Sequence, residues 1–286
     1  MAKLTTRTGP TDHPVADRET WLSARRALLT EEKVLFRDLD RLRERRRALP
    51  WVRIEEPYSF EGPEGRVTLA GLFGGARQLL VYHFMFNPKA ERGCAHCSFW
   101  ADHYDGPQWH LGARDTRFVA VSRAPLAKLR AFQRVMGWKF PWYSSGDSRF
   151  NYDFHVSFTP EAIASGQARF NYVPIPPQLT GMADREGLSA FYRDDDGTVY
   201  HTYSTYARGI DLLNTTYNLL DLTAKGRDEE PGNAQSWVRY HDRYAAAGDA
   251  RPARGGGATR KKTKKATKPR AARKKPAARA RARRRR

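Results

Sequence analysis

QLLVYHFMF, residues 78–86, is the most apolar run of the chain, and CAHC, residues 94–97, follows it after a loop of seven residues. The run is short, rich in aromatic and branched side chains, and bounded by glycine and proline. Such a run is typical of a strand that is buried on both faces of a sheet. The residues after CAHC predict a helix that starts at the cysteines.

A second strand and a second helix follow in the same order. RFVAVS, residues 117–122, predicts another buried strand, and Pro125 opens a helix over residues 126–136 that Gly137 ends. Strands and helices that alternate in this way indicate βαβ units and a parallel sheet. The core of the chain is therefore predicted to be an α/β domain.

An antiparallel hairpin is predicted later in the chain. Residues 187–193 and 198–204 read as strands, and DDDG, residues 194–197, is a strong turn signal between them. Residues 140–186 are rich in aromatics, Pro and Gly and are expected to be an irregular excursion over the body. Residues 210–222 are predicted to form a further amphipathic helix.

A long helix is predicted at the start of the domain, from Asp17 as N-cap to Arg47. Its charged run Arg41–Arg47 is interpreted as a solvated face and not as a nucleic-acid contact. Such a helix packs either on its own domain or on a second subunit, so a homo-oligomer stays open. Its apolar residues recur by threes, fours and sevens: Trp21, Leu28, Leu29, Leu35, Leu39 and Leu42.

The charge of the chain is concentrated in its last 36 residues. The 286 residues carry a net charge of +20, with 51 Lys and Arg against 31 Asp and Glu. Residues 251–286 hold 18 of those basic residues and no acidic one, which leaves the remainder near +2. We therefore expect disorder over residues 1–13, one domain over residues 14–250 and a disordered basic tail over residues 251–286.

The composition also bounds the location of the chain. No apolar run approaches the ~18 to 20 residues needed to cross a bilayer. The polar start, residues 1–14, lacks the apolar core of a secretory signal. The expectation is a cytoplasmic protein without a membrane partner.

The two cysteines, Cys94 and Cys97, are the candidate catalytic residues. Their spacing is too short to staple a domain, so it points to chemistry or to metal. Free N–H groups and the dipole at a helix start favour a thiolate at Cys94, the expected nucleophile. Cys97 lies on the same helical face and can resolve a mixed disulfide. His96 between them is expected to lower a thiol pKa further.

Other interpretations of the pair remain open. Zinc commonly takes four Cys or His ligands, and the chain has no second cysteine pair. Neither a metal nor another cofactor is therefore expected, and an inert pair is the remaining alternative. Phe99, Trp100 and Trp109 are interpreted as core packing, and His83 as a hydrogen-bonded histidine of the core.

Many segments of the chain closely resemble a bacterial family, domain of unknown function 899. This family is grouped with thioredoxin-like proteins and is often labelled a predicted dithiol–disulfide oxidoreductase. The resemblance implies a thioredoxin-like α/β fold, with a central mixed sheet flanked by helices, and a redox role for Cys94 and Cys97. It covers residues 14–245 and rests on RRALPWVRIEEPYSFEG (46–62), LLVYHFMFNP (79–88), CAHCSFWADHYDG (94–106), FVAVSRAPLAKLRAFQRVMGWKFPWYSS (118–145), FNYDFHVSF (150–158), VYHTYSTYARGIDLLNTTYNLLDLTAKGRDE (199–229) and WVRYHDRY (237–244).

The chain departs from better-known thioredoxin-like proteins at several positions. Peroxiredoxins carry Pro and Thr or Ser where this chain has Asn87 and Glu91, so peroxide reduction loses its usual hydroxyl. Thioredoxins place a cis-proline before the hairpin, where this chain has Arg185-Glu186-Gly187. Oxidising relatives carry a His before their second cysteine, as His96 stands here. The expected substrate is an unidentified dithiol or disulfide, on a protein or a small thiol.

The basic tail predicts a second partner. Its charge density should attract DNA or RNA phosphates without sequence preference, and a nucleoid association is expected from it. A non-catalytic thioredoxin-fold protein that binds nucleic acid through this tail is therefore the alternative function. The candidate contacts are Lys261, Lys262, Lys264, Lys265, Lys268, Arg273, Lys274, Lys275, Arg283, Arg284, Arg285 and Arg286.

Overall fold

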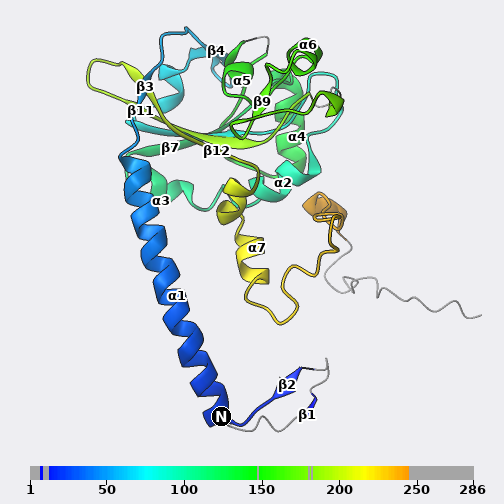
Figure 1. Ribbon diagram of the computed structural model, residues 1–286. Coiled ribbons are helices and arrows are strands. Elements are labelled where there is room, and N and C mark those ends of the chain that lie inside the picture. The colour runs from blue at the N-terminus through cyan, green and yellow to red at the C-terminus, as the bar shows by residue number, and fades with distance from the viewer. Residues whose placement is uncertain (1–6, 9–12, 147, 180, 182, 245–286) are drawn as a thin grey trace, which may run out of the picture. The chain divides into compact units, whose positions relative to one another are not determined.

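The computed structural model describes residues 7–8, 13–146, 148–179, 181 and 183–244 (Figure 1). Its centre is an eight-stranded mixed sheet in the order β3-β12-β11-β6-β7-β8-β4-β5. β6, β7 and β8 run parallel, and the hairpin β11–β12 joins β6 antiparallel. The strands are β3 (Val52–Arg53), β4 (Ser59–Gly62), β5 (Gly65–Thr68), β6 (Gln78–His83), β7 (Thr116–Ser122), β8 (Trp142–Ser144), β11 (Gly187–Arg193) and β12 (Val199–Tyr206).

Both faces of the sheet are buried, as the apolar runs predict. In β6, Leu79 and Val81 contribute to one core, while Tyr82 contributes to the core on the opposite face. Helices α2 (Ala95–Ala101) and α4 (Leu126–Met136) cover the Tyr82 face. The other face is covered by η1 (Ala70–Phe73) and by Phe150 of α5 (Phe150–Asp153).

This arrangement is thioredoxin-like, and it confirms the predicted fold class. A buried strand leads into the helix that carries the cysteines, a parallel strand follows, and an antiparallel hairpin flanks the first strand. The remaining elements are β1 (Arg7–Thr8), β2 (Pro14–Val15), α3 (Gln108–Gly112), α6 (Pro160–Ala164), β9 (Arg169–Phe170), β10 (Val173–Pro174), η2 (Pro177–Leu179), η3 (Ala207–Leu213), α7 (Thr215–Leu220) and η4 (His241–Arg243).

The long N-terminal helix is present as α1 (Arg18–Arg47), and Asp17 caps it by accepting a 2.8 Å hydrogen bond from the Thr20 amide. None of its thirty residues is buried in the described chain. Its last turn reaches β12, where the Arg46 guanidinium lies 4.5 Å from the Tyr203 ring centre.

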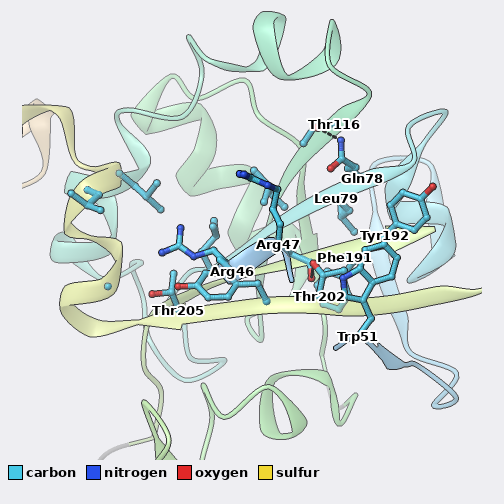
Figure 2. Close-up of a pocket in the computed structure, with 17 residues that line it drawn as sticks. Arg46, Arg47, Trp51, Gln78, Leu79, Thr116, Phe191, Tyr192, Thr202 and Thr205 are labelled. Carbon is cyan, nitrogen blue, oxygen red and sulfur yellow. Dashed lines mark hydrogen bonds between the residues drawn. The ribbon is translucent and has the colours of Figure 1, made fainter. Parts of the chain in front are cut away.

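One part of the Tyr82 face lacks a helical cover. A cavity of about 530 Å³ lies there, over the strands β6, β11 and β12 (Figure 2). Its floor includes Leu80, Leu188 and Ala190, and its rim includes the end of α1 and the η3 residues Leu212 and Leu213. We call this cavity the sheet groove.

Several sequence expectations differ from the structure. The helix predicted over residues 210–222 is broken, because Asn214 takes an extended conformation and its side chain caps α7 at the Tyr217 amide. The excursion at residues 140–186 contains β8, which extends the sheet. Arg7 and Thr8, expected to be disordered, pair with Val15 and Pro14. The basic tail lies outside the described residues.

Candidate dithiol site

The cysteines lie at the start of α2, after the loop that follows β6. Cys94 is the N-cap residue of α2 in an extended conformation, and its amide donates to the Met85 carbonyl at 3.0 Å. The preceding Gly93 has no room for a side chain, since a Cβ there would lie 2.6 Å from the Phe84 ring and 2.8 Å from the Phe132 ring. Lys128 holds the loop between strand and helix by donating to the carbonyls of Pro88 and Ala90.

The two thiols have different environments. Cys94 is partly exposed, whereas Cys97 is 1 % exposed and belongs to the core under α2. The Met85 amide donates to the Cys97 sulfur at 3.4 Å. The Cys94 thiol is thus accessible to a reaction partner, and the Cys97 thiol lies in the protein interior.

Hydrogen bonds from Cys97 and His96 lower the pKa of Cys94 to about 4, against the opposing effect of its burial. The pKa of Cys97 is raised, first by burial and then by its hydrogen bond to Cys94. The pKa of His96 is raised by its hydrogen bond to the Cys94 sulfur. At neutral pH these shifts favour a Cys94 thiolate, a neutral Cys97 thiol and a positive charge on His96.

A cavity of about 290 Å³ opens beside the pair, lined by His96, Cys97, Arg185 and Glu186 among others. Glu186 directly precedes β11, at the place where thioredoxins carry their cis-proline. Burial raises its pKa, so its carboxyl keeps a proton to higher pH than an exposed glutamate. Sequence reasoning marked this position as a departure but missed the acid as part of the site.

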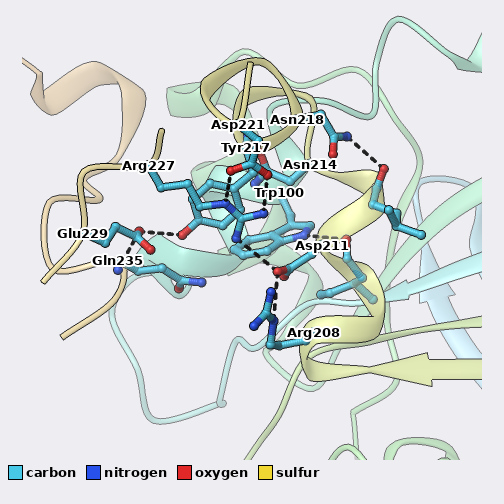
Figure 3. Close-up of polar contacts among 12 residues, drawn as sticks. Trp100, Arg208, Asp211, Asn214, Tyr217, Asn218, Asp221, Arg227, Glu229 and Gln235 are labelled. Carbon is cyan, nitrogen blue, oxygen red and sulfur yellow. Dashed lines mark hydrogen bonds and ion pairs between the residues drawn. The ribbon is translucent and has the colours of Figure 1, made fainter. Parts of the chain in front are cut away.

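The segment after η3 contributes Gln235 to the lining of this cavity. A polar network fixes this segment (Figure 3). Arg227 lies 3.9 Å from the Tyr217 ring centre and pairs with Asp211 and Asp221 at 3.2 and 2.9 Å. Glu229 accepts hydrogen bonds from the Tyr217 hydroxyl, the Gln235 amide and the Trp237 indole. Sequence patterns gave no sign of this network, because its members are spread over an irregular segment.

The same segment reaches the active-site loop at two further points. The Tyr240 hydroxyl donates to the Gly93 carbonyl at 2.7 Å, directly before Cys94. His241 and Asp102 are 2.7 Å apart, which joins the end of the described chain to the end of α2. Residues far apart in the sequence therefore enclose the cysteine pair.

The other residues singled out in the sequence divide into buried and exposed. Phe99 and Trp100 are buried residues of α2, as predicted, and the Trp100 indole donates to the Ile210 carbonyl. Trp109 is 85 % exposed, so its interpretation as core packing is wrong; α3 has no buried residue and presents it to solvent. His83 is buried and lies 2.8 Å from the Ser189 hydroxyl, and burial lowers its pKa to about 3.

Two negative observations apply to the described residues only. Among them, no three or more His, Cys, Asp or Glu side chains are placed together to hold a metal ion. No helix in the same part of the chain combines the length and apolar character needed to cross a membrane.

The fold and site define a thioredoxin-fold protein with a Cys-x-x-Cys pair at the start of its central helix. The chain belongs to the family described as "Bacterial protein of unknown function (DUF899)", which matches residues 10–244. A comparison with curated proteins found no match.

The matches among solved structures include peroxiredoxins. Peroxiredoxin Q from Xanthomonas campestris is 14 % identical with a TM-score of 0.38, over 57 % of this chain and 89 % of its own. Peroxidoxin BcpB from Mycobacterium tuberculosis is 14 % identical with a TM-score of 0.37, over 56 % and 91 %. The mitochondrial 2-Cys peroxiredoxin from Plasmodium falciparum is 10 % identical with a TM-score of 0.35, over 60 % and 92 %.

Proposed function

We propose that this chain is a thiol–disulfide oxidoreductase whose redox centre is Cys94 and Cys97. The observation that carries the proposal is the asymmetry of the pair: a partly exposed thiol with a pKa near 4 stands before a buried thiol with a raised pKa. A structural pair of cysteines has no need of such a difference, whereas disulfide exchange uses it at both of its steps.

The low pKa of Cys94 favours the reduced form of the pair, so the disulfide form acts as an oxidant. In the first step a substrate thiolate attacks the Cys94 sulfur, the Cys94–Cys97 bond breaks, and Cys97 leaves as a thiolate. Glu186, whose raised pKa keeps it protonated to higher pH, supplies the proton to Cys97. A mixed disulfide now joins Cys94 to the substrate.

In the second step another substrate thiolate attacks the substrate sulfur of the mixed disulfide. The bond to Cys94 breaks, and Cys94 leaves as a thiolate, which its low pKa and His96 stabilise. The substrate has lost two electrons and gained a disulfide, and the protein holds two reduced cysteines. A separate disulfide or another oxidant of that class must then restore the protein.

The test is a redox titration in glutathione buffers with mass-spectrometric trapping, together with a pH titration of thiolate absorbance. We expect one reversible intramolecular disulfide and one thiol that titrates near pH 4. Cys94→Ser should abolish exchange, while Cys97→Ser should accumulate a mixed disulfide at Cys94. Two thiols with pKa above ~8.5 and no reversible disulfide would overturn the proposal.

The basic tail supports a second, compatible part of the proposal, an association with nucleic acid in the cell. Eighteen Lys and Arg residues without an acidic residue favour phosphate binding by counterion release. Truncation after Ala250 should abolish DNA binding at low salt, and Cys94→Ser should leave it intact. Unchanged affinity after truncation would remove this part and leave the redox proposal standing.

A further inference from the structure

Helix α1 has two neighbouring rows of apolar side chains, with the ion pair of Arg25 and Glu32 between them, and no residue of the helix is buried in the described chain. Trp21, Leu28, Leu35 and Leu42 recur at intervals of seven residues and are 46–58 % exposed. Leu22, Leu29 and Phe36 follow them at the same interval, and Leu39 lies between the two rows. A strict repeat of seven over four heptads is the pattern of a helix that packs along another helix.

We propose that α1 is a dimerisation helix and that it packs antiparallel against α1 of a second copy of this chain. A helix of thirty residues is about 45 Å long, so the seam would extend over four heptads. In the register with Glu32 at the two-fold axis, Leu22 meets Leu42 of the second copy, and Leu28 meets its Phe36. Leu29 likewise meets Leu35 of the second copy. The layers between these contacts place Arg25 against Leu39 of the second copy and Glu32 against its Glu32.

The charge distribution favours the antiparallel orientation. Residues 18–32 hold three basic and three acidic residues, whereas residues 33–47 hold seven basic and three acidic, a net charge of +4. Parallel packing would place two such basic halves side by side, and antiparallel packing places each beside a neutral half. The helix dipoles then also run in opposite directions.

Side chains that flank the seam give the same preference. In the proposed register Glu19 lies beside Arg47 of the second copy, and Arg26 lies beside its Asp40. At the centre of the stripe Arg25 pairs with Glu32 of its own helix at 2.7 Å, so the two Glu32 residues meet already neutralised. These pairs add orientation to a seam that apolar contacts stabilise.

The sheet groove supplies the second observation. It lies at the C-terminal end of α1, where Arg46, Arg47 and Trp51 line its rim (Figure 2). An antiparallel second helix brings its own N-terminal end, with the acidic Asp17 and Glu19, to this basic rim. Among the described residues neither Arg46 nor Arg47 is in an ion pair. The proposal therefore accounts for the exposed apolar rows of α1 and for the two arginines at the groove rim that make no ion pair in the described residues.

Sedimentation equilibrium of the full chain in 0.3 M salt tests the association. We expect a dimer at micromolar concentration, and Leu28→Lys, Leu35→Lys, Leu42→Lys combined should raise the dissociation constant by at least ~100-fold, because three charges enter an apolar seam. The matched control combines Ser23→Lys, Ala27→Lys and Thr30→Lys, which adds the same charge to the opposite face of α1. A monomeric wild type, or a dimer that survives the stripe substitutions, would overturn the proposal.

Cysteine cross-linking tests the orientation in a Cys94→Ser, Cys97→Ser background. Leu22→Cys together with Leu42→Cys in one chain should give a disulfide-linked dimer on oxidation, while each single substitution should not. Cross-linking by either single substitution would indicate parallel helices and overturn the antiparallel register. Neither measurement depends on redox activity, so failure of the proposed function would leave both outcomes readable.

Discussion

Helices α1 and α2 acquire their order from different sources. α2 has seven residues, of which five are buried, and a helix of that length is not stable alone in water. α1 has thirty residues and none buried, and it carries its own cap and its own ion pairs, such as Arg25 with Glu32 and Arg43 with Asp40. The geometry of the cysteines therefore depends on the packing of the core. The order of α1 depends on contacts within the helix, and its apolar side chains are left exposed.

The largest expected effect comes from comparing two tryptophans, Trp100 in α2 and Trp109 in α3. Trp100→Ala removes a side chain that is 5 % exposed and should cost about 3–5 kcal/mol of unfolding free energy. Trp109→Ala removes one that is 85 % exposed and should stay within about 0.5 kcal/mol. Urea unfolding of the reduced proteins measures both. Equal losses would contradict the view that α2 is stabilised by packing of its buried side chains, whereas the exposed Trp109 of α3 contributes little to stability.

A second effect follows from the lowered pKa of Cys94. A thiol whose folded pKa of about 4 lies below its unfolded value of ~8.5 stabilises the folded state fully above the unfolded pKa. This contribution declines as the pH falls and is lost near pH 4. The stability advantage of the reduced wild type over Cys94→Ser should therefore shrink by up to about 1.4 kcal/mol for each pH unit between pH 8.5 and pH 4. A difference that does not change with pH would exclude the thiolate.

His96→Gln should act on the same thiol more weakly. The imidazole contributes after the hydrogen bond from Cys97, so its loss should raise the pKa of Cys94 by about one unit, equivalent to about 1.4 kcal/mol. His103→Gln is the matched control, since His103 bonds Thr216 and not a cysteine. Thiolate absorbance against pH gives both values. An unchanged Cys94 pKa in His96→Gln would assign its lowering to Cys97 alone.

The sequence predicted those parts of the molecule that are local or periodic. The strands at residues 78–86 and 117–122, the helix that starts at Cys94 and the hairpin all have short-range signals, and the structure confirms them. The break at Asn214 was not predicted, because the amphipathic pattern continues through this residue. A single side-chain hydrogen bond, from the Tyr217 amide to Asn214, ends one helix and starts the next. The prediction that Trp109 is buried was wrong, because the hydrophobicity of a side chain does not determine whether other residues pack against it.

The site was predicted only at its centre. Cys94, Cys97 and His96 share one short motif, so they could be named from spacing alone, although their roles remain proposals. Glu186 and Tyr240 reach the same place from distant segments, and no local pattern reports such a meeting. The stripe of α1 was visible as a repeat, yet a repeat does not identify its partner.

The smallest expected effect concerns the contact between Tyr240 and the loop before Cys94. Tyr240→Phe removes the hydroxyl that donates to the Gly93 carbonyl at 2.7 Å, and it should cost about 1 kcal/mol of unfolding free energy. Because this contact holds the last described segment against the site, iodoacetamide should also alkylate Cys94 faster in this variant. Tyr200→Phe is the control: it removes a hydroxyl that bonds Asp194 at the hairpin turn, and it should leave alkylation unchanged. If alkylation did not increase, the segment would not shield Cys94, and the cysteine pair would depend on the core under α2 alone.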